Sequence, residues 1–100
     1  MSMKIWYMYV VRCSDGSLYT GITTNVRRRV HEHNSTKRAA RYTRARRPVY
    51  LVYHHRCANR AEAMVSETGF KRMAKKKKEQ FILDRIEEVD LDSRPGSEDR

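Results

Sequence analysis

The chain has 100 residues, which is enough for one small domain and leaves no room for a second hydrophobic core. Lys and Arg outnumber Asp and Glu by 22 to 12, so the net charge is +10 and a polyanionic partner is predicted. No apolar run approaches the roughly 20 residues of a membrane span, and the N-terminus lacks a signal-peptide layout. We expect a cytoplasmic protein with no membrane partner.

Charge divides the chain unevenly. Residues 1–83 hold 19 basic and 5 acidic side chains, whereas residues 84–100 hold 3 basic and 7 acidic ones. We therefore predict one domain over residues 1–89 and an acidic, disordered tail over residues 90–100. The two cysteines, Cys13 and Cys57, form neither a metal-binding pattern nor a disulfide framework.

The N-terminal elements have the composition of paired strands. Residues 5–12 are dense in aromatic and β-branched side chains, and residues 18–22 follow after the turn signal Ser14-Asp15-Gly16. These two strands predict a β-hairpin.

A helix is predicted next, over residues 25–34, with Thr24 or Asn25 as its cap. One face of this helix carries Val26, Arg29, Val30 and His33, which is the spacing of a buried stripe. One arginine of the Arg27–Arg29 run therefore points inward.

The second half of the chain begins with a basic segment. Six basic residues lie within residues 35–47, where we expect an exposed loop with room for one helical turn. A third strand over residues 49–54 follows Pro48. Asn59 and Glu62 resemble a capping box and predict a helix that ends near Met73. A last amphipathic helix should begin at Lys75, with Phe81 and Ile82 on its apolar stripe.

Three groups of side chains could carry chemistry. Tyr9 and Tyr19 either pack across the hairpin or place a phenol beside Arg29, whose positive charge lowers a phenol pKa. Arg29 and His33 either reach solvent or meet the tyrosines, where both suit phosphodiester chemistry. Glu67 either pairs with Lys71 or holds a hard divalent cation that also binds water and a phosphate.

Clustered cations and one tyrosine predict a nucleic-acid surface, because phosphate contacts dominate such binding. The residues that we assign to it are Arg38, Arg41, Tyr42, Arg44, Arg46, Arg47, Lys75 and Lys76.

The chain shares a series of motifs with one known family, in the same order: Tyr7-Met8-Tyr9, Tyr19-Thr20-Gly21, Asn25-Val26-x-x-Arg29, His33-Asn34 and Glu67. Together they resemble a GIY-YIG nuclease domain. Further patterns over residues 15–21, 40–44 and 75–80 resemble the small stand-alone members of that superfamily. The resemblance covers residues 5–83.

The resemblance implies an α/β (α+β) fold with a small three-stranded antiparallel sheet flanked by helices. It also implies an endonuclease that uses one Mg²⁺ or Mn²⁺ ion and acts on nucleic acid, with DNA favoured over RNA, in repair or processing. A protein partner or a homodimer would then supply specificity. The alternatives are a DNA- or RNA-binding module without useful catalysis, and a basic protein whose partner is ribosomal or other RNA.

By the same resemblance, Tyr9 is the general base and Tyr19 the second tyrosine of the site. Arg29 would steady the phosphate, His33 would assist at the phosphate or water, and Glu67 would hold the metal. Relatives carry an asparagine after this glutamate, so Glu79 or Gln80 would have to serve here.

The register of the hairpin tests this assignment. A two-residue turn would place the phenols of Tyr9 and Tyr19 on opposite faces of the sheet. A three-residue turn with Gly16 at positive φ pairs Tyr9 with Gly21 and Tyr19 with Val11, so both phenols share one face. We also expect Arg29, His33 and Glu67 on that face, and room for a phosphate beside Gly21.

Overall fold

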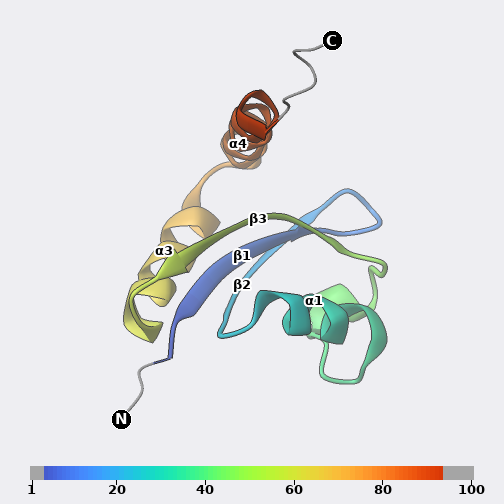
Figure 1. Cartoon of the computed structure of the whole chain (residues 1–100). Coiled ribbons are helices and arrows are strands. Elements are labelled where there is room, and N and C mark those ends of the chain that lie inside the picture. Colours follow the sequence, from blue (N-terminus) through green and yellow to red (C-terminus); the bar gives the residue numbers. More distant parts are fainter. Residues whose placement is uncertain (1–3, 94–100) are drawn as a thin grey trace.

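A three-stranded antiparallel sheet with the strand order β2-β1-β3 forms the centre of the computed structural model, which describes residues 4–93 and the side chains of residues 4–85 (Figure 1). The elements are β1 (Trp6–Arg12), β2 (Leu18–Thr23), α1 (Val26–Ser35), α2 (Arg41–Arg44), β3 (Tyr50–Cys57), α3 (Arg60–Arg72) and α4 (Lys75–Ser93). The predicted fold class, a small antiparallel sheet flanked by helices, is confirmed.

The hairpin between β1 and β2 has the three-residue turn. Gly16 has φ +85°, and its N–H donates to the carbonyl of Cys13 at 2.9 Å. Tyr9 pairs with Gly21, and Val11 pairs with Tyr19. Because partners across an antiparallel pair point to the same side of the sheet, the two tyrosines share one face. The predicted register is confirmed.

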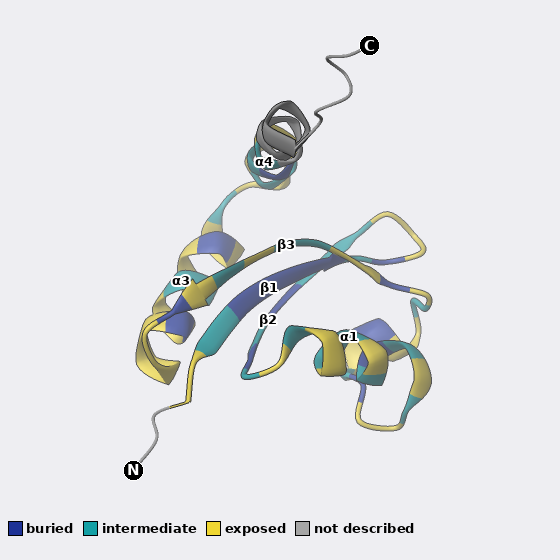
Figure 2. Ribbon diagram, in the orientation of Figure 1, coloured by how far each residue is buried: buried dark blue, intermediate teal, exposed yellow. Residues whose placement is uncertain are grey.

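Two small cores lie on opposite faces of the sheet. Met8 and Val10 pack with Phe70 of α3 and Ile82 of α4 on one face. Tyr9 and Val11 pack on the other face with Cys13 and Val49, against which Val26 and Val30 of α1 also lie. Figures 1 and 2 show α1 on one side of the sheet, α3 on the other, and dark blue buried residues along β1 between them. The predicted inward face of α1 is therefore correct.

The third strand is longer than predicted. We expected it over residues 49–54, but β3 extends to Cys57, which pairs with Trp6 at the start of β1. The polar residues 54–56 hid this extension in the sequence, since β3 is an edge strand and its outer residues need not be apolar.

Asparagine side chains cap the helix that follows the hairpin, α1, and the helix that follows β3, α3. Asn25, rather than Thr24, caps α1 by accepting a hydrogen bond from the N–H of Arg28 at 2.9 Å. Asn59 caps α3 by accepting from the N–H of Glu62 at 2.8 Å, and the Glu62 carboxylate in turn accepts from the N–H of Ala58. The predicted capping box is thus present, except that the Glu62 carboxylate binds the N–H of Ala58 instead of the N–H of the cap residue Asn59.

Helix α4 is held to the tip of the hairpin. The Arg12 guanidinium donates to both carboxylate oxygens of Glu79 at 2.6 and 2.7 Å, and Lys75 lies 3.0 Å from the same carboxylate. The helix continues to Ser93, four residues into the tail predicted for residues 90–100. The rest of that tail lies outside the described residues. Within the part of the chain that the structure describes, no helix is long and apolar enough to cross a bilayer.

Candidate active site

A buried chain of hydrogen bonds links β1 to α1 and α2. The Tyr9 hydroxyl lies 2.7 Å from Nε2 of His33, and Nδ1 of His33 lies 2.7 Å from Oγ1 of Thr43. The Thr43 hydroxyl donates to the carbonyl of Ala40 at 3.1 Å. Because that hydroxyl proton is used, Thr43 accepts from Nδ1–H, and Nε2 is left as the acceptor for the Tyr9 proton. The contacts therefore favour this tautomer of His33 and this direction of the chain.

Burial sets the charge states along this chain. Tyr9 is 1% exposed and His33 is 0% exposed. Burial raises the pKa of Tyr9 well above its usual value, and the neighbouring Tyr19 raises it further, while the Arg29 guanidinium acts in the opposite direction. Burial, together with the charge of Arg29, lowers the pKa of His33 to about 4. At neutral pH the pair is a neutral phenol that donates a hydrogen bond to a neutral imidazole, and both pKa shifts oppose transfer of the proton from Tyr9 to His33. Burial therefore outweighs the lowering of the phenol pKa by Arg29 that the sequence predicted.

Tyr19 packs against the same imidazole from the neighbouring strand. The two rings meet edge to face with their centroids 5.3 Å apart. The outer side of Tyr19 stacks on Tyr42 of α2 at 6.0 Å, and the Arg46 guanidinium covers the Tyr42 ring at 3.8 Å. Tyr42 thus has a tyrosine and an arginine as ring neighbours, so its use as a stacking platform for a base would require these contacts to change.

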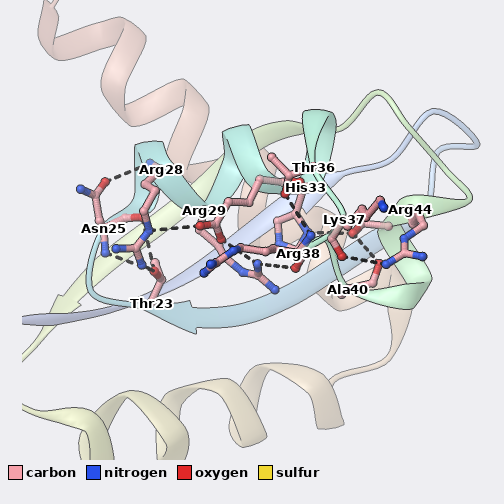
Figure 3. A network of polar contacts seen from close by, with 12 residues as sticks. Thr23, Asn25, Arg28, Arg29, His33, Thr36, Lys37, Arg38, Ala40 and Arg44 are labelled. Carbon is pink, nitrogen blue, oxygen red and sulfur yellow. Dashed lines mark hydrogen bonds and ion pairs between the residues drawn. The ribbon is translucent and has the colours of Figure 1, made fainter.

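Arg29 reaches the site from α1, between the two valines that pack on the sheet. Its Nη1 donates to Glu32 at 2.9 Å and to the carbonyl of Arg38 at 2.8 Å. The side chains of Arg28, Arg29 and Arg38 follow one another along the space between α1 and β2 (Figure 3). Arg29 is the member of this row whose charge acts on the Tyr9 hydroxyl.

Glu67 comes from the other side of the sheet, contrary to our expectation that it would share the tyrosine face. Helix α3 packs on the face of Met8 and Val10. The Glu67 carboxylate is 22% exposed and pairs with Lys71 at 3.1 Å, yet its charge contributes to the raised pKa of Tyr9. The carboxylate therefore lies close enough to the edge of β2 to act on the site electrostatically.

The donor set fits a largely hydrated cation. Among the described residues no group of three or more His, Cys, Asp or Glu side chains could enclose a metal ion. Mg²⁺ commonly binds through one or two carboxylates, keeps several waters, and takes further oxygens from a phosphate. Glu67 can supply such a carboxylate. The two residues considered as replacements for the family asparagine are engaged elsewhere: Glu79 binds Arg12, and Gln80 donates to Asp84 at 2.8 Å.

Gly21 has a different role from the one predicted. A Cβ at this position would lie 2.6 Å from the Tyr9 hydroxyl oxygen. The space above Gly21 is therefore filled by the phenol of Tyr9, and it is not open to a phosphate. A glycine is needed at this position because the Tyr9 side chain passes directly over Gly21, its partner on β2, to reach His33.

The comparisons with known proteins identify the family of this domain. The sequence model of the GIY-YIG catalytic domain matches residues 5–80. The chain belongs to the GIY-YIG family. UPF0213 proteins of Desulfotalea psychrophila and of Streptococcus pneumoniae strain R6 are 51% and 53% identical over 77 and 76 residues, which are 77% and 76% of this chain and 70% and 76% of theirs.

Two solution NMR structures are similar to this GIY-YIG domain. A UPF0213 protein from Bacillus halodurans has a TM-score of 0.51 at 41% identity, covering 78% of this chain and 82% of that one. A protein from E. faecalis has a TM-score of 0.54 at 37% identity, covering 86% of this chain and 93% of its own. The family is one of nucleases, and its catalytic domain implies binding of nucleic acid.

The basic segment of the GIY-YIG domain is more structural than the sequence indicated. Arg47 donates to the carbonyls of Glu32, His33 and Thr36 and so closes the C-terminal end of α1. Arg44 donates to the carbonyl of Lys37 at 2.7 Å, and Arg46 pairs with Asp15 at 3.0 Å. We therefore no longer propose Arg47 as a phosphate ligand.

The remaining predicted binding residues have solvent access. Arg38 and Arg41 are exposed, as are the two lysines that open α4, Lys75 and Lys76. Of these, Lys75 also contacts Glu79 and the carbonyl of Gly16. Phosphate binding by the three free-standing side chains of this group stays a prediction.

Sequence reasoning missed Thr43. It is 0% exposed in a segment that we expected to be an exposed loop, although that segment does contain the short helix α2. Thr43 was part of the family pattern over residues 40–44, but its hydroxyl was given no role. A small hydroxyl residue among arginines was the available signal, because side chains in such a run are usually long and solvated.

Proposed function

We propose that this GIY-YIG domain is a Mg²⁺-dependent endonuclease that hydrolyses phosphodiester bonds in DNA during repair or processing. The observation that carries the proposal is the directed chain from Tyr9 through His33 to Thr43, with Arg29 beside the tyrosine. A nuclease needs an acceptor for the proton of the attacking water and a cation near the phosphate. The chain and Arg29 supply these two functions.

Tyr9 acts as the base in this proposal, and His33 is a positioning residue that acts through it. We first expected His33 to assist at the phosphate or the water; because both of its ring nitrogens are engaged and it is buried, we propose instead that it acts through Tyr9. Tyr9 can accept a proton from water only as a phenolate, and burial holds its pKa well above the usual value, so the positive charge of Arg29 and of a bound metal would have to lower that pKa when the substrate binds. Proton transfers of this kind typically contribute about 10²–10⁴ in rate.

The metal ion, when bound, supplies positive charge against the phosphate and an acidic water. Glu67 would hold it, and the Arg29 guanidinium would neutralise charge on the phosphate from the α1 side. The two free, buried cysteines, Cys13 and Cys57, support a reducing, cytoplasmic setting. A single domain of this size offers little surface for selecting a substrate, so we propose that a protein partner or a second copy supplies specificity.

A second candidate is a catalytically weak or inactive DNA- or RNA-binding module. The burial of Tyr9 favours it, since a phenol with so little contact with water must move to meet a substrate.

One experiment separates the two candidates. Purified protein is incubated with labelled duplex, flap, fork and single-stranded DNA and with RNA, in Mg²⁺, Mn²⁺ or EDTA. We expect cleavage of DNA that requires the metal and falls at least about 10²-fold in Tyr9→Phe and in Glu67→Gln. Lys71→Ala is the matched control, because it removes the ion-pair partner of Glu67 and leaves the carboxylate. Cleavage that persists in EDTA would exclude the metal role, and binding without cleavage of any substrate would establish the module.

A further inference from the structure

A pocket next to the candidate active site shares Arg29 with it, while its other lining residues take no part in the chemistry described above. It has a volume of about 390 Å³, which is within the usual range for small-ligand sites of roughly 300–1,000 Å³. The side chains that give it chemical character are Trp6, Thr24, Arg28, Arg29, Glu32 and Arg38. They come from the start of β1, from the segment after β2, from α1 and from the segment after α1.

The electrostatic character of the pocket suits an anion. Three guanidinium groups face one carboxylate, and contacts from Arg29 and Arg28 hold the pKa of Glu32 below its usual value, so it remains ionised. Arg29 is the firmly bound arginine, at 2.9 Å from Glu32. Arg28 lies 3.5 Å from Glu32 and is 54% exposed, and Arg38 is exposed. These last two can turn to a phosphate while Glu32 stays paired with Arg29.

Trp6 adds an aromatic surface to this cationic pocket. It is half-buried at the start of β1, and the Arg60 guanidinium lies 5.6 Å from its ring. Guanidinium groups and an indole lining one pocket match the phosphate and the base of a nucleotide, since bases stack on aromatic rings without regard to sequence. A free phosphate would use the arginines and leave the indole without a role.

The position of the pocket relates it to the reaction. Arg29 lines the pocket and also acts on the Tyr9 hydroxyl. Arg28, Arg29 and Arg38 form a row between α1 and β2 (Figure 3), and all three line the pocket. A ligand in the pocket would therefore be continuous with a phosphate held at Arg29.

We propose that this pocket binds one nucleotide of the substrate strand, directly next to the scissile phosphate, with its base against Trp6 and its phosphate on Arg28 and Arg38. The placement of this nucleotide next to the scissile phosphate rests on the proposed function. It predicts recognition by stacking and charge, and hence tolerance of any base at this position.

Trp6 is the only tryptophan in the chain, so its fluorescence reports on this pocket alone. Titration with a short single-stranded oligonucleotide in EDTA, where no cleavage occurs, should quench the emission saturably. An end-labelled copy of the same oligonucleotide gives total binding by anisotropy, and the two curves should have the same midpoint. Binding without quenching would overturn the proposal.

Two pairs of variants test the contacts. Arg28→Ala and Arg27→Ala remove the same charge from adjacent positions of α1, but Arg27 lines a different pocket, beside Leu51 and His54. Arg28→Ala should lower the salt slope of single-strand binding by about 0.7 and Arg27→Ala should not. Trp6→Ala should weaken binding about tenfold, and Trp6→Phe should retain most of it. Equal effects of the two arginine variants would overturn the phosphate assignment.

A free nucleotide is the other source of the same chemistry. If a mononucleotide quenches Trp6 at the same concentration as the oligonucleotide, the pocket is a nucleotide site unrelated to the strand, and the proposal is wrong. Quenching with the expected variant pattern but no cleavage in metal would retain the pocket and remove the nuclease assignment. Cleavage without quenching would retain the nuclease assignment and overturn the proposed role of the pocket.

Discussion

The hydroxyl of Tyr9 lies 2.7 Å from Nε2 of His33, and this contact joins the middle strand of the sheet to α1 across 24 residues of sequence. It gives a buried phenol one defined acceptor for its proton. The same contact anchors the C-terminal end of the inward face of α1, which also carries Val26 and Val30. Structure and proposed chemistry are thus coupled in one hydrogen bond, and variants at this contact should change both.

Gly21→Ala should distort the site from the neighbouring strand. The added Cβ would lie 2.6 Å from the Tyr9 hydroxyl, so the tyrosine or β2 must shift. We expect a loss of about 1–3 kcal/mol in the free energy of unfolding, measured in urea, and reduced cleavage. Gly69→Ala is the control: no neighbouring atom lies within 4 Å of a Cβ there, and the helix should gain about 1 kcal/mol. A neutral Gly21→Ala would contradict the close contact.

His33 should make stability depend on pH. Its pKa is lowered by burial from 6.5 to about 4, so between these values the unfolded chain binds a proton that the folded chain does not. The free energy of unfolding should therefore fall by up to about 3 kcal/mol as the pH drops from 6.5 to 4. Urea unfolding at half-unit steps of pH measures this slope.

The slope is assigned to His33 by two substitutions on one helix. His33→Gln should remove most of the loss between pH 6.5 and 4, whatever its effect on absolute stability. His31→Gln should leave the loss in place, because His31 is exposed on the same helix. The contribution of Glu79 is separable, since contact with Arg12 lowers its pKa from 4.5 to about 2 and its stabilisation is lost only below pH 4.5. A slope unchanged in His33→Gln would refute the neutral buried imidazole.

Arginines of the basic segment should divide into two classes. Arg47→Ala leaves carbonyls at the end of α1 without their donor and should cost about 1–3 kcal/mol in unfolding free energy. Arg41→Ala should leave stability unchanged and lower the salt slope of duplex binding by about 0.9, if this exposed side chain contacts a phosphate. Thermal unfolding and binding at several salt concentrations measure both effects. Equal destabilisation by the two variants would argue against the capping role of Arg47.

Sequence patterns located most of the helices and strands, and the resemblance to the GIY-YIG family then chose between the two possible registers of the hairpin. Periodicity located α1 and its inward arginine, because a helix that packs on a sheet must bury one stripe of residues at this spacing. The requirement that Tyr9 and Tyr19 share a face selected the three-residue turn, and Gly16 at φ +85° agrees with it. These are local properties, or they follow from the alternation of side chains along strands.

Which polar groups come into contact could be learned only from the packing of the elements. Glu67 acts on the site from the opposite side of the sheet, because β2 is an edge strand and a helix on either face can approach it there. Thr43 and Arg47 lie in a segment that reads as solvated charge, yet they complete the chain from Tyr9 and the end of α1. Thr43 and Arg47 bind backbone carbonyls and a buried ring, and such contacts produce no periodic pattern in the sequence. The reason is physical: hydrogen bonds between distant segments depend on how elements pack, whereas strands and helices are set by neighbouring residues.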